Sequence, residues 1–324
     1  MTGEQKGKSA SVPMSRRQLG ALAGAAGLGA VVPASQAAES NRSDPPRVYY
    51  SPEISEAALF RIVDRLISDA GAKGKTGIKV HSSEANINLP LFLALRRHLP
   101  GSDFYETTWL DYDPAQTPKL ASEIEATLRR LGLKDEPINI LNRLPGSKTV
   151  PIRGGRHLKS IEVPSELLKY GVLVDLLNFK SPGFSGFVGH VKNLGIAYVT
   201  SCGKQAVHQP GYPKDPPFYE RLEDAAKGVA DAARGHIVYV TILSDYRCED
   251  IGSVKARNGR LGILGSLDPV AADQASVDLI YDGKLTIAQM NALPMARKLK
   301  TGLYQLECAE RIRFGSRTYR VMKL

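Results

Sequence analysis

The stretch at residues 171–208 constrains the fold of this chain more than any other. Its apolar run at 172–177 predicts a buried strand, and the Gly-rich turn that follows opens into a short helix carrying Lys192 and Asn193. Such a turn lets backbone amides approach a ligand closely and point at its negative charge. It is therefore a candidate binding site, although the glycines could equally serve tight packing. The spacing matches neither a Walker loop nor Gly-x-Gly-x-x-Gly.

Segments with helical and strand-like periodicity alternate beyond residue 45. Helices are predicted at 55–70, 89–98, 118–131, 217–234 and after Asp268, and strands at 77–80, 103–108, 137–141, 172–177, 236–243 and 318–323. Such alternation favours a parallel sheet that is covered on both faces. We therefore expect an α/β fold, a mainly parallel sheet flanked by helices, in one lobe or two. Asp268 and Pro269 suit the N-cap and first position of a helix.

Residues 1–37 have the layout of a twin-arginine signal peptide. Arg16 and Arg17 precede a weakly apolar Gly/Ala run, and the small residues at 33–37 suit a signal peptidase. A disordered basic leader and an uncleaved membrane anchor are the alternatives, but the apolar run is short for crossing a bilayer.

The signal predicts how the rest of the chain is organised and where it works. We expect a linker at 38–44 and one α/β domain at 45–324. The protein would be periplasmic or otherwise extracytoplasmic, would meet the twin-arginine translocase during export, and would contact a membrane only through the signal segment.

Charge and cysteine content exclude some classes of protein. The formal net charge is +10, and removal of residues 1–37 takes away a net three positive charges, which leaves about +7. No stripe of Arg and Lys with interleaved aromatic residues indicates nucleic-acid binding. The three cysteines, Cys202, Cys248 and Cys308, form no Cys-x-x-Cys, so we expect no iron–sulfur cluster. One disulfide with a third thiol left over stays an open alternative.

Polar residues follow two of the predicted strands, where parallel sheets place their ligands. Lys79, His81 and Glu84 lie at and after the strand at 77–80, and could form part of a cleft or a solvated turn. Asp245, Cys248 and Glu249 follow the strand at 236–243. They could hold a divalent metal, or they could be a solvated acidic loop, because no histidine lies nearby.

Several segments, in order along the chain, resemble domain of unknown function family 362. They are 77–84, Phe179-Lys180 with 186–193, Gly203-Lys204 with His208, 262–275, and 305–310 with Tyr319. Many members of that family carry a ferredoxin-like insertion after the position of His208, and this chain resembles the form without it. Ser181-Pro182 and Tyr246-Arg247 also depart from the family's usual Gly-His and second cysteine.

The wider family is also similar, more distantly, to the lactate racemase family, in which a nickel-pincer nucleotide is tethered to a loop lysine. That resemblance implies Lys192 as the tether and His208 as a nickel ligand. Pro182 falls where a catalytic histidine would be expected, and proline cannot transfer a proton. His190 could substitute for it. Otherwise Lys192 would be an anion-binding or helix-capping lysine and His208 a surface histidine.

Two classes of function follow. The first is an exported enzyme, dependent on a metal or cofactor, that acts on a small anionic substrate. Its catalytic residues would be Lys192 and His190, its ligand-binding residues Lys180, Gly186, Gly189 and Asn193, and its metal ligands His208, Asp245, Cys248 and Glu249. The second is an accessory protein that binds a metal or an anion without turnover. In either case we expect the loops at 77–84, 180–193 and 245–250 to line one cleft.

Overall fold

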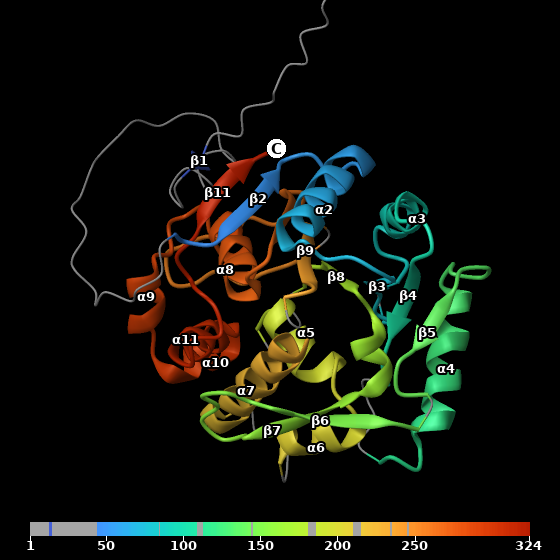
Figure 1. The fold of residues 1–324 in the computed structure, drawn as a ribbon. Helices are drawn as coiled ribbons and strands as arrows, with labels where there is room; N and C mark the ends of the chain where they lie inside the picture. Colours follow the sequence, from blue (N-terminus) through green and yellow to red (C-terminus); the bar gives the residue numbers. More distant parts are fainter. Residues whose placement is uncertain are drawn as a thin grey trace, which may run out of the picture.

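The structure, a computed structural model, is built around one large mixed sheet (Figure 1). It describes residues 13–14, 44–83, 85–108, 113–143, 145–180, 186–209, 215–233, 235–244 and 246–324. The nine strands lie in the order β1-β11-β2-β10-β9-β8-β3-β4-β5. Their bounds are β1 Pro13–Met14, β2 Arg47–Ser51, β3 Thr76–Lys79, β4 Asp103–Glu106, β5 Ile138–Ile140, β8 Val172–Asn178, β9 Ile237–Leu243, β10 Gly262–Ser266 and β11 Arg320–Lys323.

The helices of the described residues cover both faces of this sheet. They are α2 Glu56–Ala70, α3 Leu89–His98, α4 Thr117–Arg130, α5 His190–Ala197, α6 Ser201–His208, α7 Pro216–Ala232, α8 Pro269–Ile280, α9 Ile287–Ala292, α10 Met295–Thr301 and α11 Leu303–Arg311. A separate hairpin, β6 Ser147–Pro151 with β7 Ser160–Pro164, and the 3-10 helix η1 Ser165–Lys169 complete the fold.

The sheet is mainly parallel, which confirms the predicted fold class. β11 runs parallel to β2, and β9, β8, β3, β4 and β5 run parallel to one another in succession. β10 is antiparallel to both of its neighbours, β2 and β9, and β1 is antiparallel to β11.

Alternation along β8 shows how the strands build two cores. Val172, Val174 and Leu176 pack into the core beneath α2, α3 and α4. Leu173 packs into the other core, which includes side chains of α5, α7, α8 and α11. Because successive side chains point to opposite faces, Asp175 lies on the same face as Leu173, in the α5 core. Figure 1 shows the two helical layers on either side of the sheet.

Local sequence accounts for where several helices begin. The Ser55 side chain accepts a hydrogen bond from the amide of Ala58 and caps α2. Asp268 accepts from the amides of Val270 and Ala271, which confirms the predicted N-cap of α8.

Strand β10 was not predicted from the sequence, because its glycines weaken the pattern of apolar residues typical of a strand. A Cβ at Gly265 would lie 2.7 Å from Leu66 Cδ1 and 2.8 Å from Ile62 Cγ2, both of which belong to α2. The glycine is therefore needed for α2 to pack closely on the sheet.

Strand β1 falls within the predicted signal segment, where Pro13 and Met14 pair with β11. The remainder of residues 1–37 and most of the linker lie outside the described residues. None of the helices in the described part of the chain has the length and apolar character that crossing a bilayer requires.

Candidate functional site

A small pocket lies at the carboxyl ends of the neighbouring parallel strands β3 and β8. Its polar lining residues are Lys79, His81, Asn178, Lys180 and Asn193, and apolar residues such as Phe92 and Val188 complete it. We call it the cationic pocket. Its cavity volume is about 20 Å³, which is room for about one water molecule. The structure thus brings two of the three expected loops together, since 77–83 and 180–193 both contribute.

His81 is the most perturbed group of the cationic pocket. Its pKa lies well below the usual value, first because burial disfavours the charged ring, and then because the positive charges of Lys180, Lys79 and Lys192 repel a proton there. The ring is therefore neutral at pH 7. Its Nδ1 accepts a hydrogen bond from the amide of Ser83 at 3.2 Å, which leaves the ring proton on Nε2.

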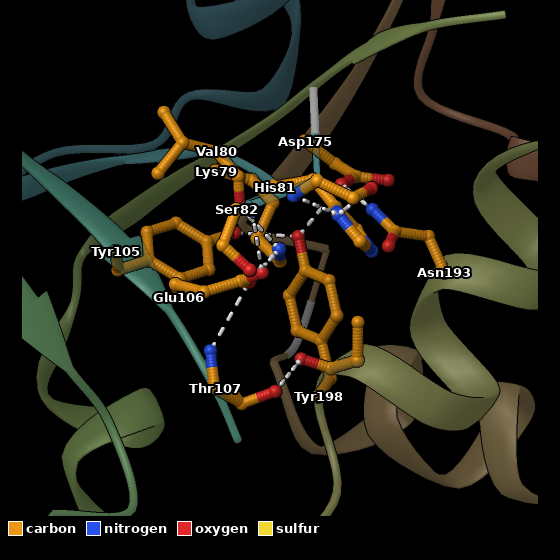
Figure 2. A network of polar contacts seen from close by, with 12 residues as sticks. Lys79, Val80, His81, Ser82, Tyr105, Glu106, Thr107, Asp175, Asn193 and Tyr198 are labelled. Carbon is orange, nitrogen blue, oxygen red and sulfur yellow. Dashed lines mark hydrogen bonds and ion pairs between the residues drawn. The ribbon is translucent and has the colours of Figure 1, made fainter. Parts of the chain in front are cut away.

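Lys79 is held beneath the pocket by a buried carboxylate. Its ammonium group contacts Glu106 and donates to the carbonyl of Val80 at 2.6 Å, and both charged side chains are almost fully buried. Glu106 also accepts from the amides of Ser82 and Thr107 (Figure 2). A carboxylate with this many donors fixes the turn after β3 and the position of Lys79.

Asp175 organises the start of α5 on the other side of the pocket. Its two oxygens accept from Asn193 Nδ2 at 2.6 Å and from the Tyr198 hydroxyl at 3.0 Å, and lie 2.7 Å from His190 Nδ1. His190 Nε2 lies 2.8 Å from the Thr241 hydroxyl. His190 is fully buried, with both ring nitrogens engaged in the core, so its ring does not reach a ligand in the pocket. Asn193 does line the pocket, and Asp175 orients its amide.

The N-terminus of α5 is occupied by a side chain of the protein itself. The Asp273 carboxylate, from α8, accepts the amide hydrogens of His190 at 2.8 Å and Val191 at 3.0 Å. A Cβ on Gly189 would lie 2.3 Å from that carboxylate, so glycine is needed here. The sequence suggested that these amides bind an external anion, but an internal carboxylate takes that place. Burial raises the pKa of Asp273 to about 6.

Gly186 fits the Gly-rich loop against the C-terminal helices. Its φ is +75°, and a Cβ there would lie 2.0 Å from the Gly302 nitrogen at the junction of α10 and α11. Gln305 of α11 donates to the carbonyl of Phe187 at 3.3 Å. Glycine at this position therefore serves close packing, the alternative that the sequence left open.

The acidic loop contributes to a different hollow. Cys248 and Glu249 line a cavity of about 40 Å³ together with Gly186, Phe187 and Lys300, which we call the acidic-loop hollow. Glu249 lies 3.0 Å from the Lys300 ammonium group. The expectation of a single cleft therefore does not hold for Cys248 and Glu249, which are not among the described residues that line the cationic pocket. Glu84, Asp245 and Pro182 lie outside the described residues.

The residues proposed for nickel do not form a metal site in the described part of the chain. His208 ends α6, where its ring packs 5.2 Å from that of Phe218, and it is not among the described residues that line the cationic pocket. The described residues contain no group of three or more His, Cys, Asp or Glu side chains that could hold a metal ion. All three cysteines are free thiols.

Sequence reasoning missed several residues that position the site. They are Glu106, Asp175, Asn178 and Tyr198. One signal was available, since Asp175 is the only charged residue in the strand of seven residues, all buried, that forms β8. A charge buried in a central strand requires partners and therefore predicts a polar network. Glu106 and Tyr198 carried no comparable signal.

The fold and the pocket define an α/β protein with a lysine-lined pocket at the carboxyl edge of a mainly parallel sheet. The model of a family described as "Domain of unknown function (DUF362)" matches residues 114–278, which confirms the resemblance seen in the sequence. The chain belongs to this family. No curated protein matches the chain significantly.

Two solved structures show distant similarity. One is the lactate racemase apoprotein from Thermoanaerobacterium thermosaccharolyticum, with 14% identity, a TM-score of 0.44, and coverage of 74% of this chain and 58% of that one. The other is a structural-genomics protein from Thermotoga maritima, with 10% identity, a TM-score of 0.39, and coverage of 71% and 59%. The chain therefore spans less than two thirds of the length of either structure.

Proposed function

We propose that this protein is an enzyme that binds a small anionic substrate in the cationic pocket and transfers a proton through His81. The observation that carries the proposal is that Lys79, which is paired with Glu106, and Lys180 line one pocket with the neutral His81, whose pKa the charge of Lys192 also lowers. The positive potential of these lysines would attract an anion, and perturbed titratable groups in a pocket are typical of functional sites.

His81 is neutral at pH 7, and its Nδ1 lone pair accepts a hydrogen bond from the Ser83 amide. To act as a general base, the ring must exchange that hydrogen bond for the substrate proton at Nδ1. An arriving anion would raise its pKa toward neutrality, because the anion's negative charge favours the protonated ring. The histidine would thus become a better proton acceptor when the substrate is bound. Asn193, fixed by Asp175, would hold and orient the anionic group.

The test is binding followed by proton exchange. Isothermal titration would measure the affinity for acetate, phosphate and a panel of 2-hydroxy and 2-oxo acids, and NMR in D2O would detect deuterium entering a bound substrate. We expect His81→Gln to retain most of the affinity and lose the exchange. If no anion binds the wild-type protein, the proposal is wrong. Binding without exchange of any tested substrate would favour the accessory role.

We also propose export by the twin-arginine route to an extracytoplasmic compartment. The support is the sequence pattern of residues 1–37. Mass spectrometry of the protein from its native compartment would show whether the chain starts near residue 38, and Arg16→Lys with Arg17→Lys should block export. The same mass, with elemental analysis, would reveal any adduct on Lys192 and any nickel.

A further inference from the structure

The cationic pocket is too small to enclose a whole substrate. Its volume of about 20 Å³ accommodates about one water-sized group. A carboxylate or phosphate could contact the lining only at its tip, and the remainder of the molecule would have to lie outside. A neighbouring surface would have to receive that remainder.

A larger hollow shares the turn after β3 with the cationic pocket. It has a cavity volume of about 240 Å³, about twelve times that of the cationic pocket, and we call it the α4 hollow. Its lining residues are Ser82, Ser83, Thr108, Leu120, Glu123, Ile124 and Thr127. His81 lines one cavity and Ser82 and Ser83 line the other.

Hydrogen bonds join the walls of the two cavities. The Ser83 hydroxyl lies 2.8 Å from His81 Nδ1, and the Ser82 amide donates to Glu106, the carboxylate that holds Lys79 (Figure 2). A ligand lying across this turn would therefore touch groups that are fixed relative to the lysines.

The lining of the α4 hollow indicates what it could accept. Leu120 and Ile124 are aliphatic and only partly buried, and the serine and threonine residues add hydroxyl groups without charge. Glu123 is the one charged residue among the described lining residues, and it is negative. An uncharged chain fits this surface, whereas a second anionic group would be repelled by Glu123.

We propose that the α4 hollow receives the uncharged aliphatic chain of a substrate whose single anionic group sits at the cationic pocket. The substrate class is then a monoanionic acid with an aliphatic chain that crosses the turn and covers Leu120 and Ile124. This inference rests on the proposed function, since the anionic end must first be bound by the lysines.

Chain length supplies the test. Isothermal titration with acetate, butyrate, hexanoate and the dianion adipate should give an affinity that rises about two- to fourfold per added methylene up to hexanoate, as expected for partly to fully buried CH2 groups. Adipate should bind more weakly than hexanoate.

Variants in α4 separate the two ends of the ligand. Thr127→Trp should fill the hollow and abolish the gain from chain length while leaving acetate affinity unchanged. Ile124→Ala should halve the increase in affinity with chain length. This smaller substitution tests the same surface if the tryptophan variant disturbs the fold. Ser122→Trp is the matched control, because Ser122 is exposed on the same helix and is not among the described lining residues.

The outcomes are distinguishable. If acetate and hexanoate bind equally, or if Thr127→Trp leaves the chain-length gain intact, the inference about the α4 hollow is wrong and the proposed function survives. If no member of the series binds, the proposed function itself fails and this inference with it. A gain that is lost in Thr127→Trp and kept in Ser122→Trp supports the inference.

Discussion

The N-terminal end of α5 separates two regions in which charged side chains are arranged differently. On the core side, the fully buried Asp175 carboxylate forms hydrogen bonds with the side chains of His190, Asn193 and Tyr198. On the pocket side, the charges of Lys180 and Lys192 act on the same space as His81 and lower its pKa. The core side therefore pairs a charge with complementary hydrogen-bonding groups, whereas the pocket side brings side chains of like charge close together.

This difference separates a stabilising role from a functional one. A charge in the core must be matched by hydrogen bonds, because an unmatched buried charge costs several kcal/mol. Like charges around a pocket lower stability slightly and persist where they meet a ligand. The comparison predicts that substitutions on the core side will alter folding, whereas substitutions on the pocket side will alter binding and the pKa of His81.

The largest expected effect is on the core side. Asp175→Ala leaves the His190 ring, the Asn193 amide and the Tyr198 hydroxyl without their shared acceptor. We expect the free energy of unfolding, measured by urea denaturation, to fall by about 3–5 kcal/mol. Asp175→Asn retains the shape and one acceptor oxygen and should cost less. A loss below about 1 kcal/mol in Asp175→Ala would contradict the stabilising role of this network.

A second test concerns Glu223 of α7, which also lies on the core side. Both of its carboxylate oxygens are buried without a hydrogen-bond partner among the described residues, and its pKa is raised well above the usual value, first by burial and then by Asp273 and Asp224. The folded state therefore holds a proton that the unfolded state releases. The stability that this proton contributes is fully present below the unfolded pKa, near pH 4.5, and is lost as pH rises toward the folded pKa.

Glu223→Gln should remove this dependence. In the wild type we expect the contribution of Glu223 to decrease by about 1.4 kcal/mol per pH unit above pH 5 until the folded pKa is reached. The variant should show a flatter profile and higher stability at pH 8, measured as urea midpoints across pH 5–9. Asp224→Asn is an informative comparison, because Asp224 accepts three backbone amides and should instead lose stability on substitution. Equal slopes in the wild type and Glu223→Gln would refute the protonated state.

Much of the fold could be predicted from periodicity. The helix at 89–98 and the strand at 172–177 agree with α3 and β8 to within a residue or so, because apolar spacing and caps are local. Strands β2 and β10 and the hairpin β6–β7 were missed. In β10 the glycine that serves contact with α2 weakens the strand signal, and in β6 only Val150 is buried, so no apolar alternation marks it.

The candidate site was harder to predict, because it depends on contacts between distant segments. The sequence brought forward Lys79, His81 and Lys180, since polar residues after parallel strands gather at one edge. It could not reveal that Asp273, 83 residues from His190, would bind the backbone amides at the N-terminus of α5, which the sequence predicted to bind a ligand. Nor could it predict that Cys248 and Glu249 would line a hollow together with Gly186 and Lys300, a contact between segments far apart in the sequence.

On the pocket side, Lys180→Met should change binding and leave folding intact. Burial is the largest cause of the low pKa of His81 and Lys180 is the next, so its removal should raise that pKa, which histidine NMR would follow. Affinity for acetate should fall about five- to tenfold, the loss of roughly one favourable charge interaction. Stability should change by less than about 0.5 kcal/mol. Lys169→Met, at an exposed lysine of η1, is the control that should alter neither property.

The smallest effect is expected in the acidic-loop hollow, where Glu249→Gln removes an exposed ion pair with Lys300. Exposed pairs contribute little, so stability should change by no more than about 0.5 kcal/mol. Because Glu249 is not among the described residues that line the cationic pocket, acetate affinity and the pKa of His81 should also be unchanged. If the variant instead altered anion binding as strongly as Lys180→Met, the two cavities would act as one site. The loop at 246–250 would then belong with the pocket, as the sequence suggested, and the Gly-rich loop would connect them.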